Sequence, residues 1–144
     1  MRRRIVALVA LLVAVTAMVF AAGCSRSDTP ITSNQDSIYH TWDWVESIGG
    51  FSGMPVHPDS VGYSETIVFA SRGTYQVYQN DQLVREGEYD LQMEELWPES
   101  DEIGLVLTYS DGFRPRAEVK IDDDTLTLSD LIMDGYTRIF VKTR

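Results

Sequence analysis

Hydrophobic and polar residues alternate in short runs over most of the chain after residue 38, which is the pattern of half-buried β-strands. Trp42 and Trp44 lie two positions apart, so on a strand both indoles face the same side. Two indoles are too much apolar surface to leave in water, and we expect this side to form the domain interior. Seven further runs alternate in the same way: 65–71, 74–79, 83–91, 103–109, 116–121, 125–128 and 136–142.

Turn residues separate these runs at short intervals, and no strongly amphipathic helix interrupts them. The turns are expected at Arg72-Gly73, Asn80-Asp81, Ser110-Asp111-Gly112, Asp122–Asp124 and Asp134-Gly135. Short links between successive strands favour an up-and-down arrangement, and closing eight strands into a barrel removes exposed edges. We therefore predict an all-β, eight-stranded, antiparallel up-and-down barrel. A two-layer sandwich of the same strands is the alternative.

Alternation also identifies the side chains that would line a ligand pocket inside the barrel. They are Trp44, Phe69, Tyr75, Tyr89, Leu105, Leu107, Val119 and Leu126. The alternative is that the same residues simply fill a solid core, as in many small barrels. Arg85 falls on one face with Leu83, Gly87, Tyr89 and Leu91. If this face is inward, Arg85 would pair with the carboxylate of a fatty acid or a similar anion; at a reversed or bulged strand end it would lie in water instead.

Two connections are longer than the others, and long loops in compact domains are often functional. Gly49–Ser64 is rich in glycine and proline, whereas Gln92–Asp101 is acidic and contains Trp97. The first is expected either to cover the barrel mouth as a lid or to be a plain connection. As a lid, it would place Phe51, Met54 and Tyr63 against a ligand. Trp97 is expected either to anchor a partner protein or to pack against the barrel end.

The ordered set of segments resembles the small bacterial lipocalin-like domain. The matching segments are His40–Val45, Gly49-Gly50, Ile67–Phe69, Gly73–Tyr75, Gly87–Tyr89, Asp124–Asp130 and Asp134–Thr137. The resemblance implies a cup-shaped barrel that accepts an apolar ligand, and it brings no catalytic residues. In larger lipocalins a Gly-x-Trp on the first strand packs under an arginine of the last strand, although here His40 replaces the glycine. The resemblance thus implies that Trp42 and Arg138 close the barrel base; the alternative is a solvated Arg138.

The first residues differ from the rest of the chain. A basic start is followed by an apolar run from Ile5 to Phe20 and by small residues before Cys24, the only cysteine. This pattern is typical of a secretory signal peptide, and the alternative is an uncleaved membrane helix. Ala22-Gly23-Cys24 resembles the lipobox of bacterial lipoproteins, which implies that Cys24 carries acyl chains such as palmitate. We predict a signal peptide over 1–23, the lipidated cysteine and a flexible tether over 24–37, and the barrel domain over 38–144. The resemblance implies a domain held to a bacterial membrane, in the periplasm or outside the cell.

Charge and residue content exclude several kinds of function. The chain carries a net charge of −10 at pH 7, which becomes −13 when Arg2, Arg3 and Arg4 leave with the signal peptide. So acidic a surface repels phosphates, and we expect no nucleic-acid partner. The two histidines, His40 and His57, have no metal-ligand spacing, and no nucleophile–histidine pattern or phosphate-binding loop occurs. We expect no metal, no cofactor, no catalytic residues and no enzymatic activity.

These observations predict an envelope lipoprotein whose barrel binds a small apolar or amphipathic molecule. The alternative is a solid-cored barrel that presents the connections 49–64 and 92–101 to another envelope protein. In one form of that alternative, the Trp97 loop inhibits an enzyme.

Overall fold

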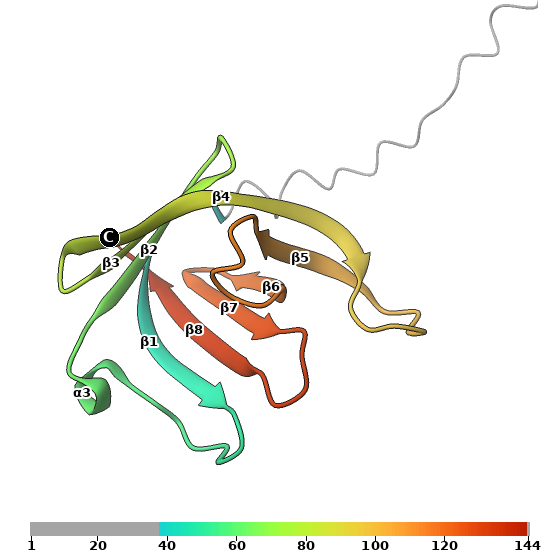
Figure 1. Ribbon diagram of the computed structural model, residues 1–144, viewed down its shortest axis with the longest axis horizontal. Helices are drawn as coiled ribbons and strands as arrows, with labels where there is room; N and C mark the ends of the chain where they lie inside the picture. Colours follow the sequence, from blue (N-terminus) through green and yellow to red (C-terminus); the bar gives the residue numbers. More distant parts are fainter. Residues whose placement is uncertain (1–37, 144) are drawn as a thin grey trace, which may run out of the picture. The chain divides into compact units, whose positions relative to one another are not determined.

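The computed structural model describes residues 38–143, which form a closed barrel of antiparallel strands (Figure 1). The strands are β1 (Thr41–Gly49), β2 (Glu65–Ala70), β3 (Thr74–Gln79), β4 (Gln82–Glu95), β5 (Ile103–Tyr109), β6 (Ala117–Asp122), β7 (Thr125–Asp130) and β8 (Tyr136–Lys142). Each strand pairs with its neighbours in the sequence, and β8 returns to pair with β1. A short helix, α3 (Pro58–Val61), lies between β1 and β2. The predicted eight-stranded up-and-down barrel is confirmed, and the sandwich alternative is wrong.

The tight links between strands use residues that tolerate a left-handed backbone. Asn80 and Asp81 have φ angles of 48° and 64° between β3 and β4, as a type I′ hairpin turn requires. Asp123, between β6 and β7, and Asp134, between β7 and β8, have φ angles of 49° and 55°. Asparagine and aspartate adopt this conformation more readily than other residues with a side chain, so these turns form where the sequence allows them.

Inward-facing side chains of all eight strands fill the barrel. The largest fully buried side chains are Trp42, Tyr75, Phe69, Phe140, Ile38, Ile67, Leu107, Leu126, Leu128, Val77 and Val106. Trp42 and Trp44 both face inward, as predicted, and are 0% and 8% exposed. The rings of Phe69 and Tyr89 meet edge to face with their centroids 5.1 Å apart. Burial of large apolar side chains stabilises a fold by roughly 1.5–3 kcal/mol each, so this interior supplies most of the stability.

The end of the barrel where β1 begins is closed by Trp42 and the residues before it. The indole Nε1 of Trp42 donates to the backbone oxygen of Ile38 at 2.9 Å, and Ile38 is fully buried. Lys142 lies opposite Trp42 in the β1–β8 ladder, whereas Arg138 lies opposite Ser47 near the other end of β1. The predicted contact between Arg138 and Trp42 is therefore wrong, because the register places the two residues apart. Trp42 closes the base with Ile38 instead.

Strand β4 departs from the prediction at both of its ends. Val77 lies opposite Arg85 but Tyr78 lies opposite Leu83, so a bulge turns Leu83 away from the face that Arg85 shares with Tyr89. The strand also continues through Glu95, because its second half pairs with β5 along its whole length. The connection predicted over 92–101 is therefore limited to residues 96–102.

The ladder between β5 and β6 is the shortest in the barrel. It consists of the pairs Val106–Glu118 and Leu107–Ala117. The pairing of β4 with β5, by contrast, extends from Tyr89–Tyr109 to Glu95–Ile103. In Figure 1 the end of the β4–β5 hairpin extends away from β6, β7 and β8. The barrel is thus closed but weakly joined at this position.

Candidate functional site

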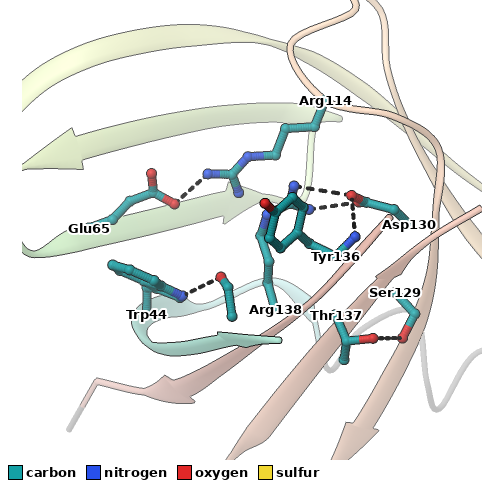
Figure 2. A network of polar contacts seen from close by, with 9 residues as sticks. Trp44, Glu65, Arg114, Ser129, Asp130, Tyr136, Thr137 and Arg138 are labelled. Carbon is teal, nitrogen blue, oxygen red and sulfur yellow. Dashed lines mark hydrogen bonds and ion pairs between the residues drawn. The ribbon is translucent and has the colours of Figure 1, made fainter. Parts of the chain in front are cut away.

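A cluster of charged side chains lies at the end of the barrel where β1 ends and β2 begins (Figure 2). Three of them occupy inward positions on their strands: Glu65 on β2, Asp130 on β7 and Arg138 on β8. Arg114, from the β5–β6 connection, is the fourth. We call these four residues the polar network. Its two arginines and two carboxylates balance in charge.

Arg114 and Glu65 form an ion pair that is almost closed to water. Arg114 Nη2 donates to Glu65 Oε1 at 2.5 Å, and the two side chains are 12% and 8% exposed. The guanidinium carbon of Arg114 also lies 4.6 Å from the ring centre of Phe113. Burial is the largest single influence and would lower the pKa of Arg114, but the charge and hydrogen bond of Glu65, together with the electrostatic effects of Tyr109 and Asp130, outweigh it and the pKa is raised. Arg114 therefore stays cationic inside the barrel.

Asp130 holds the second arginine and also the start of β8. Its carboxylate accepts hydrogen bonds from Arg138 Nη1 at 2.7 Å and Nη2 at 3.2 Å. It accepts a third from the backbone N–H of Tyr136 at 3.0 Å. A two-pronged arginine–carboxylate pair fixes orientation as well as distance. One rung along the same hairpin, the hydroxyls of Ser129 and Thr137 lie 3.3 Å apart (Figure 2).

Two buried polar atoms of this region have no hydrogen-bond partner within residues 38–143: the hydroxyl of Tyr109 and Nη1 of Arg114. Burial raises the pKa of Tyr109 well above its ordinary value, although the charges of Arg114 and Arg138 oppose this, so the phenol keeps its proton. A buried polar group without a partner costs about 1–3 kcal/mol. Both atoms can donate a hydrogen bond, so each could be satisfied by an acceptor such as an oxygen atom.

The β1–β2 connection packs against the end of β1 near this network. The backbones of Ser47 and Val56 exchange two hydrogen bonds of 2.9 and 2.8 Å. Trp44 donates from Nε1 to the hydroxyl of Ser47 at 2.9 Å, and its ring stacks on that of Tyr63 with centroids 6.0 Å apart. Of the three residues expected in a lid, Tyr63 thus lies against the interior, whereas Phe51 is fully exposed.

Arg85 belongs to a second cluster, which adjoins the polar network because Arg85 and Arg114 both lie over the ring of Phe113. Arg85 Nη1 donates to Asp111 Oδ2 at 2.6 Å, and the hydroxyl of Tyr75 donates to the same oxygen at 2.9 Å. Desolvation opposes ionisation of Asp111, but the hydrogen bonds from Tyr75, the Phe113 amide and Arg85 outweigh it and lower its pKa. The Arg85 side chain is 43% exposed and its guanidinium stacks over Phe113 at 4.7 Å. Arg85 therefore faces solvent in part and already has a carboxylate partner.

The remaining side chains predicted to line a pocket are in the core. Trp44, Phe69, Tyr75, Tyr89, Leu105, Leu107, Val119 and Leu126 all point into the barrel and are at most 9% exposed. Tyr89 donates to the backbone oxygen of Ala70 at 3.0 Å, so its hydroxyl is occupied. This burial agrees with the inward direction predicted for each of them, and their role toward a ligand stays a prediction.

Sequence reasoning missed Glu65, Tyr109, Arg114 and Asp130. A signal was present for two of them, because Glu65 and Asp130 continue the apolar faces of β2 and β7 as inward charged residues. Charged residues at such positions are rarely left unpaired. Arg114 gave no such signal, since it lies in a connection without periodicity.

The remaining predictions concern metal binding, membrane-spanning helices and the N-terminal segment. Within residues 38–143, no group of three or more histidine, cysteine or acidic side chains is placed to share a metal ion. No helix in this range is long and apolar enough to cross a membrane. Cys24 and the predicted signal peptide and tether lie outside the described residues.

Comparisons with known proteins found no match for this chain among protein-family models, curated proteins or solved structures.

Proposed function

We propose that this protein is a binding protein of the bacterial cell envelope whose barrel takes a small amphipathic molecule with an uncharged, oxygen-bearing head group. The observation that supports this is the pair of buried donors, Tyr109 Oη and Arg114 Nη1, which have no protein acceptor within residues 38–143. They lie beside an interior lined with apolar and aromatic side chains, which suits the rest of such a molecule.

The charge balance of the polar network favours a neutral head group over an anionic one. Glu65 and Asp130 already neutralise Arg114 and Arg138. A ligand carboxylate would add an uncompensated charge to a buried site, which is costly. An ester or amide carbonyl accepts the same two hydrogen bonds without that cost. We place the head group at Arg114 and Tyr109 rather than at Arg85, because Arg85 already pairs with Asp111. We infer a neutral acyl ester or amide in preference to the fatty acid expected at Arg85.

The test uses the full-length protein in lipid nanodiscs and two soluble eight-carbon probes, monooctanoyl glycerol and octanoate. Calorimetric titration should show saturable binding of the glycerol ester and at least tenfold weaker binding of octanoate. Tyr109→Phe removes one donor and should weaken binding of the ester about two- to tenfold, because a neutral hydrogen bond contributes about 0.5–1.5 kcal/mol. Tyr78→Phe is the matched control, since the Tyr78 hydroxyl bonds to Gln76 on the outer side of β3. Equal binding of both probes, or no effect of Tyr109→Phe, would contradict the proposal.

A second candidate function, recognition of another envelope protein, is favoured by exposed apolar side chains on two adjoining connections. Phe51 and Met54 are 102% and 66% exposed on the β1–β2 connection, and Met133 is 90% exposed on the β7–β8 turn. The Gly50 amide donates to the Gly135 oxygen at 3.3 Å, so the two connections touch. Exposed apolar patches of this kind are typical of contact surfaces. A photo-crosslinking residue in place of Phe51 should trap a partner in the intact envelope, and Met133→Ser should abolish the adduct.

The proposed membrane anchor rests on Cys24 and is tested separately. In the host, Cys24→Ser should release the protein from the membrane fraction. Mass spectrometry of the wild-type N-terminal peptide should show a diacylglyceryl-modified or triacylated cysteine at its first position. An unmodified residue 24 that is preceded by the intact apolar segment would support the uncleaved membrane helix instead.

A further inference from the structure

Strands β5 and β6 separate after two residue pairs, and we call the gap between them the β5–β6 seam. Along this seam the backbone edges of both strands are open. The ladder stops at Val106–Glu118, and beyond that pair Ile103–Leu105 of β5 pairs only with β4 among the described residues. Residues Val119–Asp122 of β6 pair only with β7 in the same way. Backbone N–H and C=O groups that lack a ladder partner are a template for a further strand. The seam therefore offers hydrogen bonds to an extended segment from both sides.

A hollow of about 250 Å³ lies in this gap. Its inward-facing side chains are apolar: Met93 of β4, Leu105 of β5, and Val119 and Ile121 of β6. Gly104, Glu118 and Lys120 complete the lining. Pockets for whole small molecules usually enclose about 300–1,000 Å³, so the hollow is better matched to one or two side chains. An inserted strand would point every second side chain into it, as the period of two requires.

The surroundings of the hollow are strongly acidic. Residues 94–102 contain Glu94, Glu95, Glu99, Asp101 and Glu102 and no basic residue, and Asp122–Asp124 lie at the end of β6. Arg116 pairs with Glu94 and Lys120 pairs with Glu118, so these two carboxylates are neutralised. The other four carboxylates of 94–102 form no ion pair among the described residues. A segment entering the seam therefore meets an uncompensated negative potential, which attracts cationic residues.

We propose that the β5–β6 seam binds an extended basic segment of a partner protein by strand addition, with apolar residues at alternate positions directed into the hollow. Main-chain hydrogen bonds supply the affinity in this mode, and the hollow and the acidic rim supply the selectivity. A second copy of the chain is a poor occupant, because both molecules carry a net charge of −10. This surface lies apart from the polar network, so the proposal is independent of the ligand function above.

The test uses the full-length protein in nanodiscs and the capped peptide Lys-Val-Lys-Val-Thr-Val-Lys-Val-Lys. We expect saturable binding, with slowed amide hydrogen exchange confined to residues 103–105 and 119–122. A control peptide with two of the inner valines replaced by proline keeps the charge but loses backbone donors and should bind at least tenfold more weakly. Equal binding of the two peptides, or protection elsewhere in the barrel, would overturn the proposal.

One substitution separates strand addition from simple charge attraction. Met93 is 47% exposed at the hollow, so Met93→Glu is compatible with the fold and makes the site more acidic. Strand addition predicts at least a tenfold loss of peptide binding, because a carboxylate now occupies the apolar hollow, whereas charge attraction predicts a gain. Val61→Glu adds the same charge on α3, where Val61 is 40% exposed, and should leave binding within twofold of wild type. Sedimentation velocity provides the last check: dimers of the free wild-type protein that disappear in Met93→Glu would identify a second copy as the occupant and refute a basic partner.

Discussion

Removal of the Glu65 carboxylate tests the polar network most directly. Glu65→Ala removes the carboxylate partner of Arg114, whose side chain is only 12% exposed. Loss of one partner from a buried pair typically costs about 3–5 kcal/mol, because an uncompensated charge remains inside. Arg114 belongs to a connection, and rotation of its side chain toward solvent would relieve part of this cost. We therefore expect the lower end, about 3 kcal/mol.

Urea unfolding followed by tryptophan fluorescence measures this loss, since Trp42 and Trp44 are both buried. With a slope of about 2 kcal/mol per molar urea, the midpoint should fall by about 1.5 M. Glu94→Ala is the matched control: it breaks the ion pair with Arg116, whose side chains are 48% and 36% exposed. Exposed pairs contribute about 0–1 kcal/mol, so its midpoint should fall by less than about 0.5 M.

The double variant Glu65→Leu/Arg114→Met removes both charges and keeps the volume. Replacing a buried ion pair by apolar residues is often neutral or stabilising, so its midpoint should return to that of wild type or exceed it. The reasoning is refuted if Glu65→Ala and Glu94→Ala lose the same stability, because the Glu65 pair would then be accessible to water. It is also refuted if the double variant is less stable than Glu65→Ala.

The further predictions concern two positions, Tyr109 and Gly49. Tyr109→Phe removes a buried hydroxyl without a protein partner, so urea unfolding at pH 7 should show equal stability or a gain of about 1–3 kcal/mol; a loss above 1 kcal/mol would show that the hydroxyl has a partner. Burial raises the pKa of Tyr109 above its ordinary 10.0, so the phenol loses its proton at a lower pH in the unfolded chain than in the folded protein. The stability that the protonated phenol contributes is therefore complete below about pH 10 and is lost as the pH rises further. The free energy of unfolding, measured from about pH 9 to 11.5, should fall less steeply for Tyr109→Phe than for wild type. Gly49 has φ 140°, and a Cβ added there would collide with the carbonyl oxygen of Gly135. Gly49→Ala should therefore lower the melting temperature by several degrees more than Gly53→Ala, whose Cβ has open space. Equal melting temperatures would mean that the end of β1 and the β7–β8 turn can move apart without cost.

Much of the barrel follows from local pattern. Alternation placed Trp42, Trp44, Phe69 and Tyr75 on the inner face, because side chains alternate between the two sides of any strand whatever its partner. Turn residues such as Asn80-Asp81 set the ends of the strands, since their backbone conformations are permitted by the residues themselves. These features need no knowledge of the rest of the molecule.

The candidate sites required the tertiary structure. The bulge opposite Val77 and Tyr78 separates the faces of Arg85 and Leu83, and nothing in the run 83–91 reveals it. Register places Arg138 opposite Ser47 rather than Trp42, so its partner is Asp130.

The chain sequence by itself therefore determined the number and direction of the strands and the inward direction of most of their buried apolar side chains. Only the closed barrel decided that Arg114 meets Glu65, which lies 49 residues away, and that β5 and β6 part after two pairs. The physical reason is that alternation and turn preference act between neighbouring residues. Ladder registers, bulges and buried ion pairs depend instead on how all eight strands share one interior.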